Sequence, residues 1–166
     1  MLIEFDDEKI VDLVEPDLRA RFNFVTKEIK APMPRARTRG WQINADDLLS
    51  ESCRLRISPE ADVALGFTTK DIYVPDMNFV FGLASSDGGC AVVSAHRLES
   101  SDPGLFKERL LKEVVHEVGH VLGLPHCSDR RCVMRFSNSL EDIDFKSTEM
   151  CENCSAKLSF LMQRTS

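Results

Sequence analysis

Apolar positions in the first thirty residues change from strand-like to helical spacing and back. Residues 2–5 form a short apolar run, residues 8–21 carry apolar side chains at helical spacing, and residues 22–29 alternate apolar with polar positions. The order strand, helix, strand predicts two parallel strands joined by a helical crossover. Pro16 predicts a kink or a break in this first helix, because proline has no backbone N–H to donate.

The middle of the chain predicts a loop, a short helix and a hairpin. Residues 31–40 are rich in proline and arginine and predict an exposed loop, after which Asn44 or Asp46 could cap a helix running through Ser52. Residues 61–69 predict a core strand. The apolar segments 78–85 and 90–97, separated by a turn at residues 86–89, predict a hairpin.

A long amphipathic helix dominates the last third of the chain. Asp102 followed by Pro103 is typical of a helix start. One apolar arc then recurs at helical spacing: Leu110, Leu111, Val114, Val115, Val118, Val121 and Leu122. Residues 136–146 are polar and predict irregular structure, and residues 148–163 predict a closing helix. The whole pattern predicts an α+β fold, a mixed twisted sheet with helices packed behind it.

Length and charge narrow the class of protein. The 166 residues make up one domain's worth of chain, and 43% hydrophobic with 29% charged residues is an ordinary globular composition. A formal net charge of -6 argues against nucleic acid or an anionic membrane as partner. Residues 1–7 lack the pattern of a signal peptide, and no apolar run approaches the roughly 18 residues of a membrane span. We therefore predict a cytoplasmic monomer without membrane or nucleic-acid partners.

Residues 116–126 read H-E-x-x-H-x-x-G-x-x-H. On a helix, His116 and His120 project from one face, opposite the apolar arc, and converging imidazoles suit Zn²⁺. Gly123 can end the helix in the left-handed conformation, so that His126 returns as a third ligand. Glu117 can then take a proton from a water on the metal. Three protein ligands with an open fourth position indicate a catalytic zinc.

Four cysteines form a C-x4-C…C-x2-C set: Cys127, Cys132, Cys151 and Cys154. In a reducing compartment this spacing favours a tetrahedral structural Zn²⁺, with two disulfides as the alternative. The other two cysteines, Cys53 and Cys90, have no partner at metal spacing and are predicted to be core thiols.

The zinc motif resembles that of the metzincin metallopeptidases, and the run from His126 through Cys154 resembles the archaemetzincin family in particular. This resemblance implies that Met134 is the Met-turn residue beneath the zinc ligands and that the cysteines hold a second zinc, giving two Zn²⁺ per chain. It also implies one metzincin-like domain over residues 1–166. Residues 1–126 would form the sheet and active-site helix, and residues 127–166 would form a small cysteine-zinc part ending in a helix. A strand bordering the cleft would pair with a bound peptide, and the candidates are Phe79, Val80, Phe81, Gly82, Leu83 and Ala84.

The resemblance therefore implies a zinc metallopeptidase that acts on peptides or proteins, with Glu117 as general base and with aminopeptidase action as one option. Two alternatives remain open at this stage. One is a zinc-dependent amidase acting on a non-peptide substrate, because the motif fixes the water-activating groups and not the acyl group. The other is a non-catalytic, zinc-stabilised peptide-binding module, against which the presence of Glu117 argues.

Overall fold

The computed structural model describes residues 1–6, 9–56 and 61–165. The main sheet has five strands in the order β2-β1-β5-β8-β7. Their bounds are Leu2–Glu4 (β1), Glu28–Lys30 (β2), Ala64–Thr68 (β5), Gly82–Ser85 (β7) and Cys90–Ser94 (β8). Neighbouring strands are parallel except β7, which is antiparallel to β8 and forms one edge. A small second sheet contains β3 (Thr38–Arg39), β4 (Gln42–Asn44) and β6 (Ile72–Tyr73).

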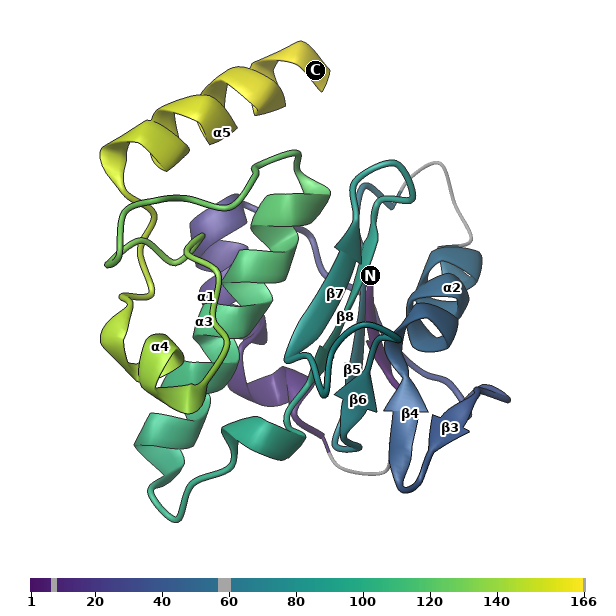
Figure 1. The fold of residues 1–166 in the computed structure, drawn as a ribbon. Helices are drawn as coiled ribbons and strands as arrows, with labels where there is room; N and C mark the ends of the chain where they lie inside the picture. The colour runs from purple at the N-terminus through teal and green to yellow at the C-terminus, as the bar shows by residue number, and fades with distance from the viewer. Residues whose placement is uncertain (7–8, 57–60, 166) are drawn as a thin grey trace.

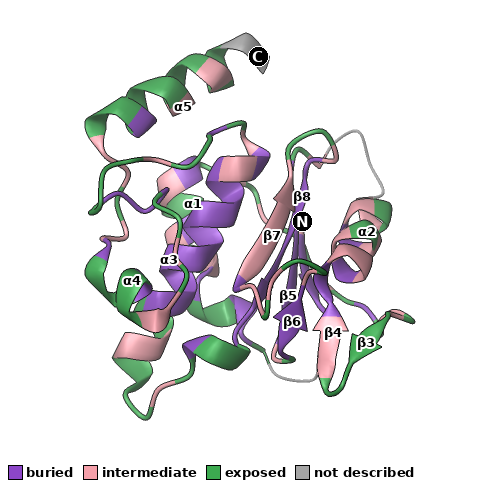
Figure 2. Cartoon of the chain, in the orientation of Figure 1, coloured by how far each residue is buried: buried purple, intermediate pink, exposed green. Residues whose placement is uncertain are grey.

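Helices cover both faces of the main sheet (Figure 1). Helices α1 (Glu15–Phe22) and α3 (Pro103–Val121) share one apolar core with Leu65 and Val93, whereas α2 (Ala45–Leu55) shares the opposite core with Ala64 and Val92. Strands β5 and β8 are buried throughout, as Figure 2 shows, because they lie between these layers. The remaining helices are α4 (Leu140–Phe145) and α5 (Glu152–Thr165), with 3-10 turns at Val11–Leu13 and His96–Leu98. The predicted α+β fold is confirmed.

Several local predictions are also confirmed. Strands β1 and β2 are parallel with a helical crossover between them, and β7 and β8 form the predicted hairpin. Asn44 caps α2, because its side chain accepts a hydrogen bond from the backbone N–H of Asp47. Asp102 caps α3 in the same way, with Pro103 in the first turn. None of the described helices combines the length and the apolar character needed to cross a bilayer.

The predictions at both ends of the first crossover need correction. Position 8, the predicted helix start, lies outside the described residues, and the segment divides into the 3-10 turn Val11–Leu13 and α1, with Pro16 in the first turn of α1. Helix α1 continues to Phe22 and ends at Asn23, whose φ of 55° is left-handed. The strand predicted for residues 22–29 was therefore wrong at its start, and β2 begins at Glu28.

Two further predictions fail in the last third of the chain. Residues 136–146 are not wholly irregular, because Ser139 accepts a hydrogen bond from the N–H of Asp142 and starts α4. The closing helix, predicted from residue 148, begins at Glu152 as α5, so Cys151 precedes the helix.

Cys53 and Cys90 are not separate core thiols. The structure joins them in a disulfide across 37 residues, with their Cα atoms 5.2 Å apart. The reason is tertiary: α2 lies directly over β8, which brings two distant cysteines together. Sequence spacing carried no signal of this pairing.

Candidate active site and cysteine cluster

Helix α3 positions the residues of the predicted zinc motif. Its apolar arc is buried against the sheet, and the opposite face carries His116, Glu117 and His120. The helix ends before Gly123, whose φ of +94° turns the chain. This turn brings His126 back to the other two histidines, with ring centroids 5.3 Å from His116 and 4.6 Å from His120.

The imidazoles of α3 direct their Nε2 atoms towards a common point. The Nδ1 atoms of His116 and His120 lie 2.8 Å from the carbonyl oxygens of Val133 and Leu124. A carbonyl can only accept, so each Nδ1 carries the proton and each Nε2 presents a lone pair. The two Nε2 atoms are 3.0 Å apart, close to the roughly 3.3 Å between ligands about 2.0 Å from a tetrahedral zinc. One ligand atom from each of His116, His120 and His126 lies within 4.8 Å of the others, so this set fits a zinc ion.

All three histidines are held in the neutral form that binds metals. Burial lowers the pKa of His116 to about 2, with further lowering by the charge of Lys146 and by His120. Burial is also the main cause that lowers the pKa of His120 and of His126. A neutral imidazole needs no proton release before it binds a metal ion.

Glu117 lies in the wall between α3 and β7. Its exposed fraction is 5%, and burial, with the nearby charge of Glu113, raises its pKa well above 4.5. A Cβ atom at position 82 would lie 2.6 Å from Oε1 of Glu117. Gly82 is therefore the residue of β7 that leaves space for this carboxylate.

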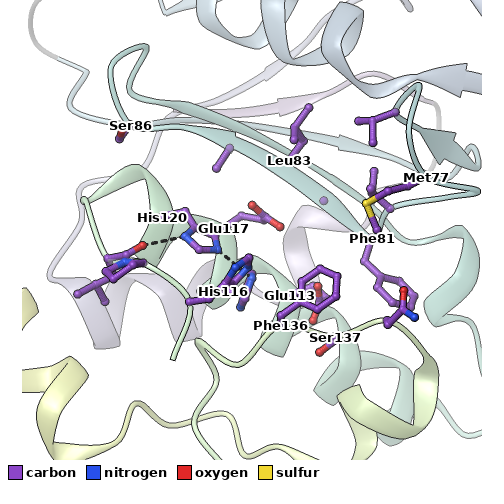
Figure 3. A pocket seen from close by; sticks show the side chains of 18 of the residues that line it. Met77, Phe81, Leu83, Ser86, Glu113, His116, Glu117, His120, Phe136 and Ser137 are labelled. Atoms are coloured by element: carbon purple, nitrogen blue, oxygen red, sulfur yellow. Dashed lines mark hydrogen bonds between the residues drawn. The ribbon is translucent and has the colours of Figure 1, made fainter. Parts of the chain in front are cut away.

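A cavity of about 490 Å³ lies in front of these groups. Figure 3 shows His116, Glu117 and His120 on one side of it and Leu83 and Phe81 on the other. The six residues predicted to border the cleft all line the cavity: Phe79, Val80, Phe81, Gly82, Leu83 and Ala84. The last three belong to β7, the edge strand of the main sheet. Pairing of this edge with a peptide stays a prediction.

Met134 lies fully buried against α3. A Cβ atom at position 119 would come 2.8 Å from its Cε, so Gly119, between the two motif histidines of the helix, makes room for the thioether. The carbonyl of Met134 accepts a hydrogen bond of 2.9 Å from the N–H of Cys127. The preceding residue, Val133, holds the ring of His116. Met134 thus belongs to the segment that orients a histidine, in keeping with the predicted Met-turn position.

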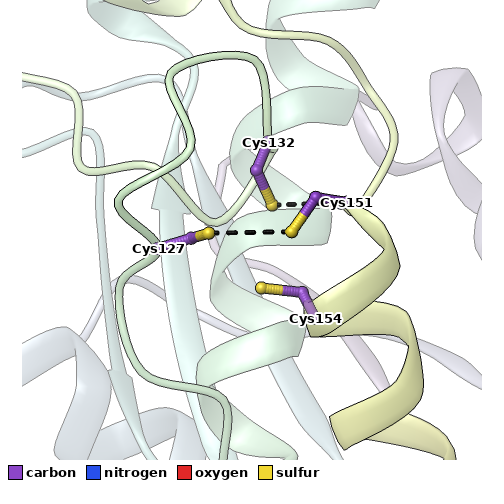
Figure 4. A group of neighbouring side chains, drawn as sticks. All are labelled: Cys127, Cys132, Cys151 and Cys154. Atoms are coloured by element: carbon purple, nitrogen blue, oxygen red, sulfur yellow. Dashed lines mark hydrogen bonds between the residues drawn. The ribbon is translucent and has the colours of Figure 1, made fainter.

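The four cysteines of the predicted cluster converge (Figure 4), with their Sγ atoms within 4.8 Å of one another. None of them is in a disulfide, and the Sγ atoms of Cys127 and Cys151 are 3.7 Å apart. Sulfurs about 2.3 Å from a tetrahedral zinc would be separated by roughly 3.8 Å. The N–H groups of Asp129 and Cys151 donate to the sulfurs of Cys127 and Cys132. The donor set fits a second zinc.

Comparison with known proteins agrees with this geometry. The family model of peptidase family M54 matches residues 44–160, a span that includes both candidate metal sites. The chain belongs to peptidase family M54. Membership makes it a zinc metallopeptidase, a hydrolase.

Its relatives within M54 are archaemetzincins. The chain is 51% identical to the archaemetzincin of Archaeoglobus fulgidus over 111 residues, which cover 67% of this chain and 69% of that protein. It is 54% identical to the protein of Aeropyrum pernix over 94 residues, which cover 57% of this chain and 51% of the relative.

Solved archaemetzincin structures match almost the whole fold. The structure from Methanopyrus kandleri has a TM-score of 0.88 at 39% identity and covers 98% of this chain and 93% of its own. The structure from Archaeoglobus fulgidus, complexed with malonate, has a TM-score of 0.83 at 39% identity and covers 94% and 97%. The similarity therefore extends to the N-terminal half of the chain, which contains none of the motifs that carried the resemblance.

Gly119, Glu113 and Lys146 were not predicted as site residues from the sequence. Gly82 was predicted to border the cleft, but its role in making room for Glu117 was not. At Gly82 and Gly119, a Cβ atom would clash with Glu117 and with Met134, respectively. Each clash is with a residue outside the glycine's own strand or helix, so it depends on how the elements pack. Glu113 and Lys146 form a buried ion pair with Nζ and Oε1 2.8 Å apart. The spacing of Glu113, one helical turn before Glu117, places both carboxylates on the same side of α3 but gives no indication of Lys146.

Proposed function

We propose that this chain hydrolyses peptide bonds in the cavity between α3 and β7, with zinc held by His116, His120 and His126. The observation that carries the proposal is the convergence of two Nε2 lone pairs beside a buried carboxylate. Neutral imidazoles and an accessible cavity add to it. A purely structural metal site would have no use for Glu117 in that position.

His116, His120 and His126 would hold the zinc ion, which would supply Lewis-acid chemistry towards the scissile carbonyl and a water of lowered pKa. Glu117 would accept a proton from the attacking water as general base and deliver it to the leaving amine as general acid. Because burial raises its pKa, the carboxyl group is a better proton acceptor than an exposed glutamate. Gly82 keeps the carboxylate close to the edge strand, where the reacting bond would lie.

The substrate would be an extended peptide laid along the edge of the main sheet. Within the described chain, β7 pairs with β8 on one side only, so its other side is available for main-chain hydrogen bonds. Phe79 and Phe81 give the cavity apolar walls for side chains. Aminopeptidase action is the narrower form of this proposal.

The four cysteines would hold a second, structural zinc, which gives two Zn²⁺ per chain. Support comes from four converging, unoxidised sulfurs and two backbone N–H donors to them. This site would fix the segment from Cys127 to Met134, whose Val133 carbonyl orients His116. The structural zinc would thereby stabilise the catalytic one.

The first test is digestion of a complex peptide mixture by zinc-loaded wild type and Glu117→Ala, read by mass spectrometry. We expect new peptides with wild type and at least a roughly 100-fold lower rate with the variant, at unchanged zinc content. Glu108→Ala, an exposed glutamate of the same helix, is the matched control and should cut like wild type. Cleavage by Glu117→Ala at the wild-type rate would remove Glu117 from the mechanism.

Zinc content is measured on the same samples. Wild type should contain two zinc ions, and His116→Ala should contain one. If neither wild type nor Glu117→Ala cuts while zinc occupies the histidine site, peptide hydrolysis is refuted. The amidase then becomes the better assignment, or the peptide-binding module if both variants bind peptides equally.

A further inference from the structure

One end of the cavity is polar although most of its wall is apolar. Glu113 lies on α3 one turn before Glu117, is 3% exposed, and still lines the cavity. Ser137 lines the same region, and Figure 3 shows both residues beside Phe136 and His116, on the side away from His120. The proposed zinc chemistry uses neither Glu113 nor Ser137.

The carboxylate of Glu113 keeps acceptor positions beyond its ion pair with Lys146. Lys146 lies 2.8 Å from Oε1, and its ammonium also donates to the carbonyl of Arg135 at 3.3 Å. A carboxylate offers about four acceptor positions. Among the described residues, Oε1 has the ion-pair contact but accepts no well-aligned hydrogen bond. Lys146 is not among the residues that line the cavity, so the carboxylate, not the ammonium, faces the substrate space.

Ser137 is a second, independent sign of a binding position. Its Oγ is buried and has no hydrogen-bond partner in the part of the chain that the structure describes. Buried polar atoms without partners are few in native proteins, and each one calls for a physical reason. Here the unpartnered Oγ of Ser137 lines the same cavity as the carboxylate of Glu113.

At this end of an apolar cavity, the carboxylate of Glu113, paired with Lys146 away from the cavity, and the hydroxyl of Ser137 offer oxygen acceptors. Such acceptors complement a cation with several N–H donors. We propose that Glu113 and Ser137 bind a protonated nitrogen of the substrate. That nitrogen is either the α-ammonium of a peptide N-terminus or the side chain of a lysine or arginine. The inference rests on the proposed peptidase function and specifies which substrates it selects.

The competing explanation for the buried pair of Glu113 and Lys146 is a purely structural role. Lys146 follows α4 directly, so its pair with Glu113 also joins α3 to the C-terminal segment. If the pair only stabilises the fold, replacing it changes stability and leaves substrate preference as it was. The ratio of kcat/KM between two substrates, measured for the same enzyme variant, therefore separates the two explanations.

The test compares zinc-loaded wild type, Glu113→Gln and Ser137→Ala on a peptide library. The library is used unmodified, acetylated only at its N-termini, and acetylated at all amines. A Glu113→Gln/Lys146→Met variant removes both charges, because the single variant leaves a buried lysine unpaired and could fail to fold. Glu108→Gln is the control. Glu108, like Glu113, pairs with a buried lysine, here Lys112 of the same helix, but the carboxylate of Glu108 is exposed.

For wild type we expect kcat/KM to be at least about tenfold higher for peptides with a protonated nitrogen at one fixed place relative to the cut. Loss of this preference on N-terminal acetylation alone identifies the α-ammonium, and loss only on full acetylation identifies lysine. Glu113→Gln and the double variant should abolish the preference, Ser137→Ala should weaken it, and Glu108→Gln should retain it.

Wild type without any such preference, or an undiminished preference in both Glu113 variants, would overturn the inference and leave the peptidase intact. A zinc-loaded wild type that cuts no peptide would instead refute the proposed function, and the inference with it.

Discussion

Gly82→Ala is expected to impair catalysis without removing zinc. Its new Cβ would lie 2.6 Å from Oε1, 2.7 Å from Cγ and 2.8 Å from Cδ of Glu117. Ordinary van der Waals contact begins near 3.4 Å, so the carboxylate must withdraw by about 0.6 to 0.8 Å. The histidine rings are held by carbonyls elsewhere and are not struck.

The size of the effect follows from this displacement. A catalytic group misplaced by about 1 Å can lose roughly 100-fold in rate, so we expect a 30- to 100-fold fall in kcat/KM, or about 2 to 2.7 kcal/mol. Overpacking costs about 1–3 kcal/mol of folding free energy, but replacing a strand glycine returns about 0.5–1 kcal/mol. The net loss of stability should therefore stay within about 2.5 kcal/mol.

The assay measures kcat/KM on a peptide that wild type cuts, together with zinc content and thermal unfolding. Ala156→Gly changes one methyl group at an exposed position of α5 that does not line the cavity, and should keep activity within about threefold of wild type. In a Glu117→Ala background, Gly82→Ala should lower activity no further, because the group it displaces is gone. Wild-type turnover by a zinc-loaded Gly82→Ala, or loss of its zinc, would refute this reasoning.

Three further outcomes test other parts of the structure. Cys151→Ser should lower zinc from two to one per chain by elemental analysis, and unchanged zinc would contradict the cysteine site. Gly119→Ala should lower the urea-measured stability by about 1–3 kcal/mol, and by less when Met134 is also alanine. The hydrogen bond from Arg109 lowers the pKa of Asp144 below 3.8, so the pair stabilises the fold above that pH and less as pH falls. Asp144→Asn should thus cost about 1 kcal/mol at pH 7, with the difference from wild type shrinking towards pH 3 in denaturant titrations.

Helix geometry made part of the candidate site predictable from sequence. The positions of His116, Glu117 and His120 follow from 3.6 residues per turn, and the apolar arc decides which face the histidines take. Gly123 supplied the turn that returns His126, since a left-handed residue there is favourable for glycine. The convergence of the four cysteines could also be predicted, because spacing of this kind is typical of a tetrahedral site.

Contacts between distant elements could not be predicted in this way. The disulfide of Cys53 with Cys90 depends on α2 lying over β8, and the pairing of Glu113 with Lys146 depends on how α4 meets α3. Local spacing contains no information on either approach.

The sequence by itself therefore determined the fold class, the active-site helix and the candidate ligands, because these follow from periodicity and short spacings along one element. Only the tertiary structure decided that the carboxylate of Glu117 lies against Gly82 and that Glu113 faces the cavity. The physical reason is that burial, charge pairing and steric room arise between elements, and packing brings those elements together.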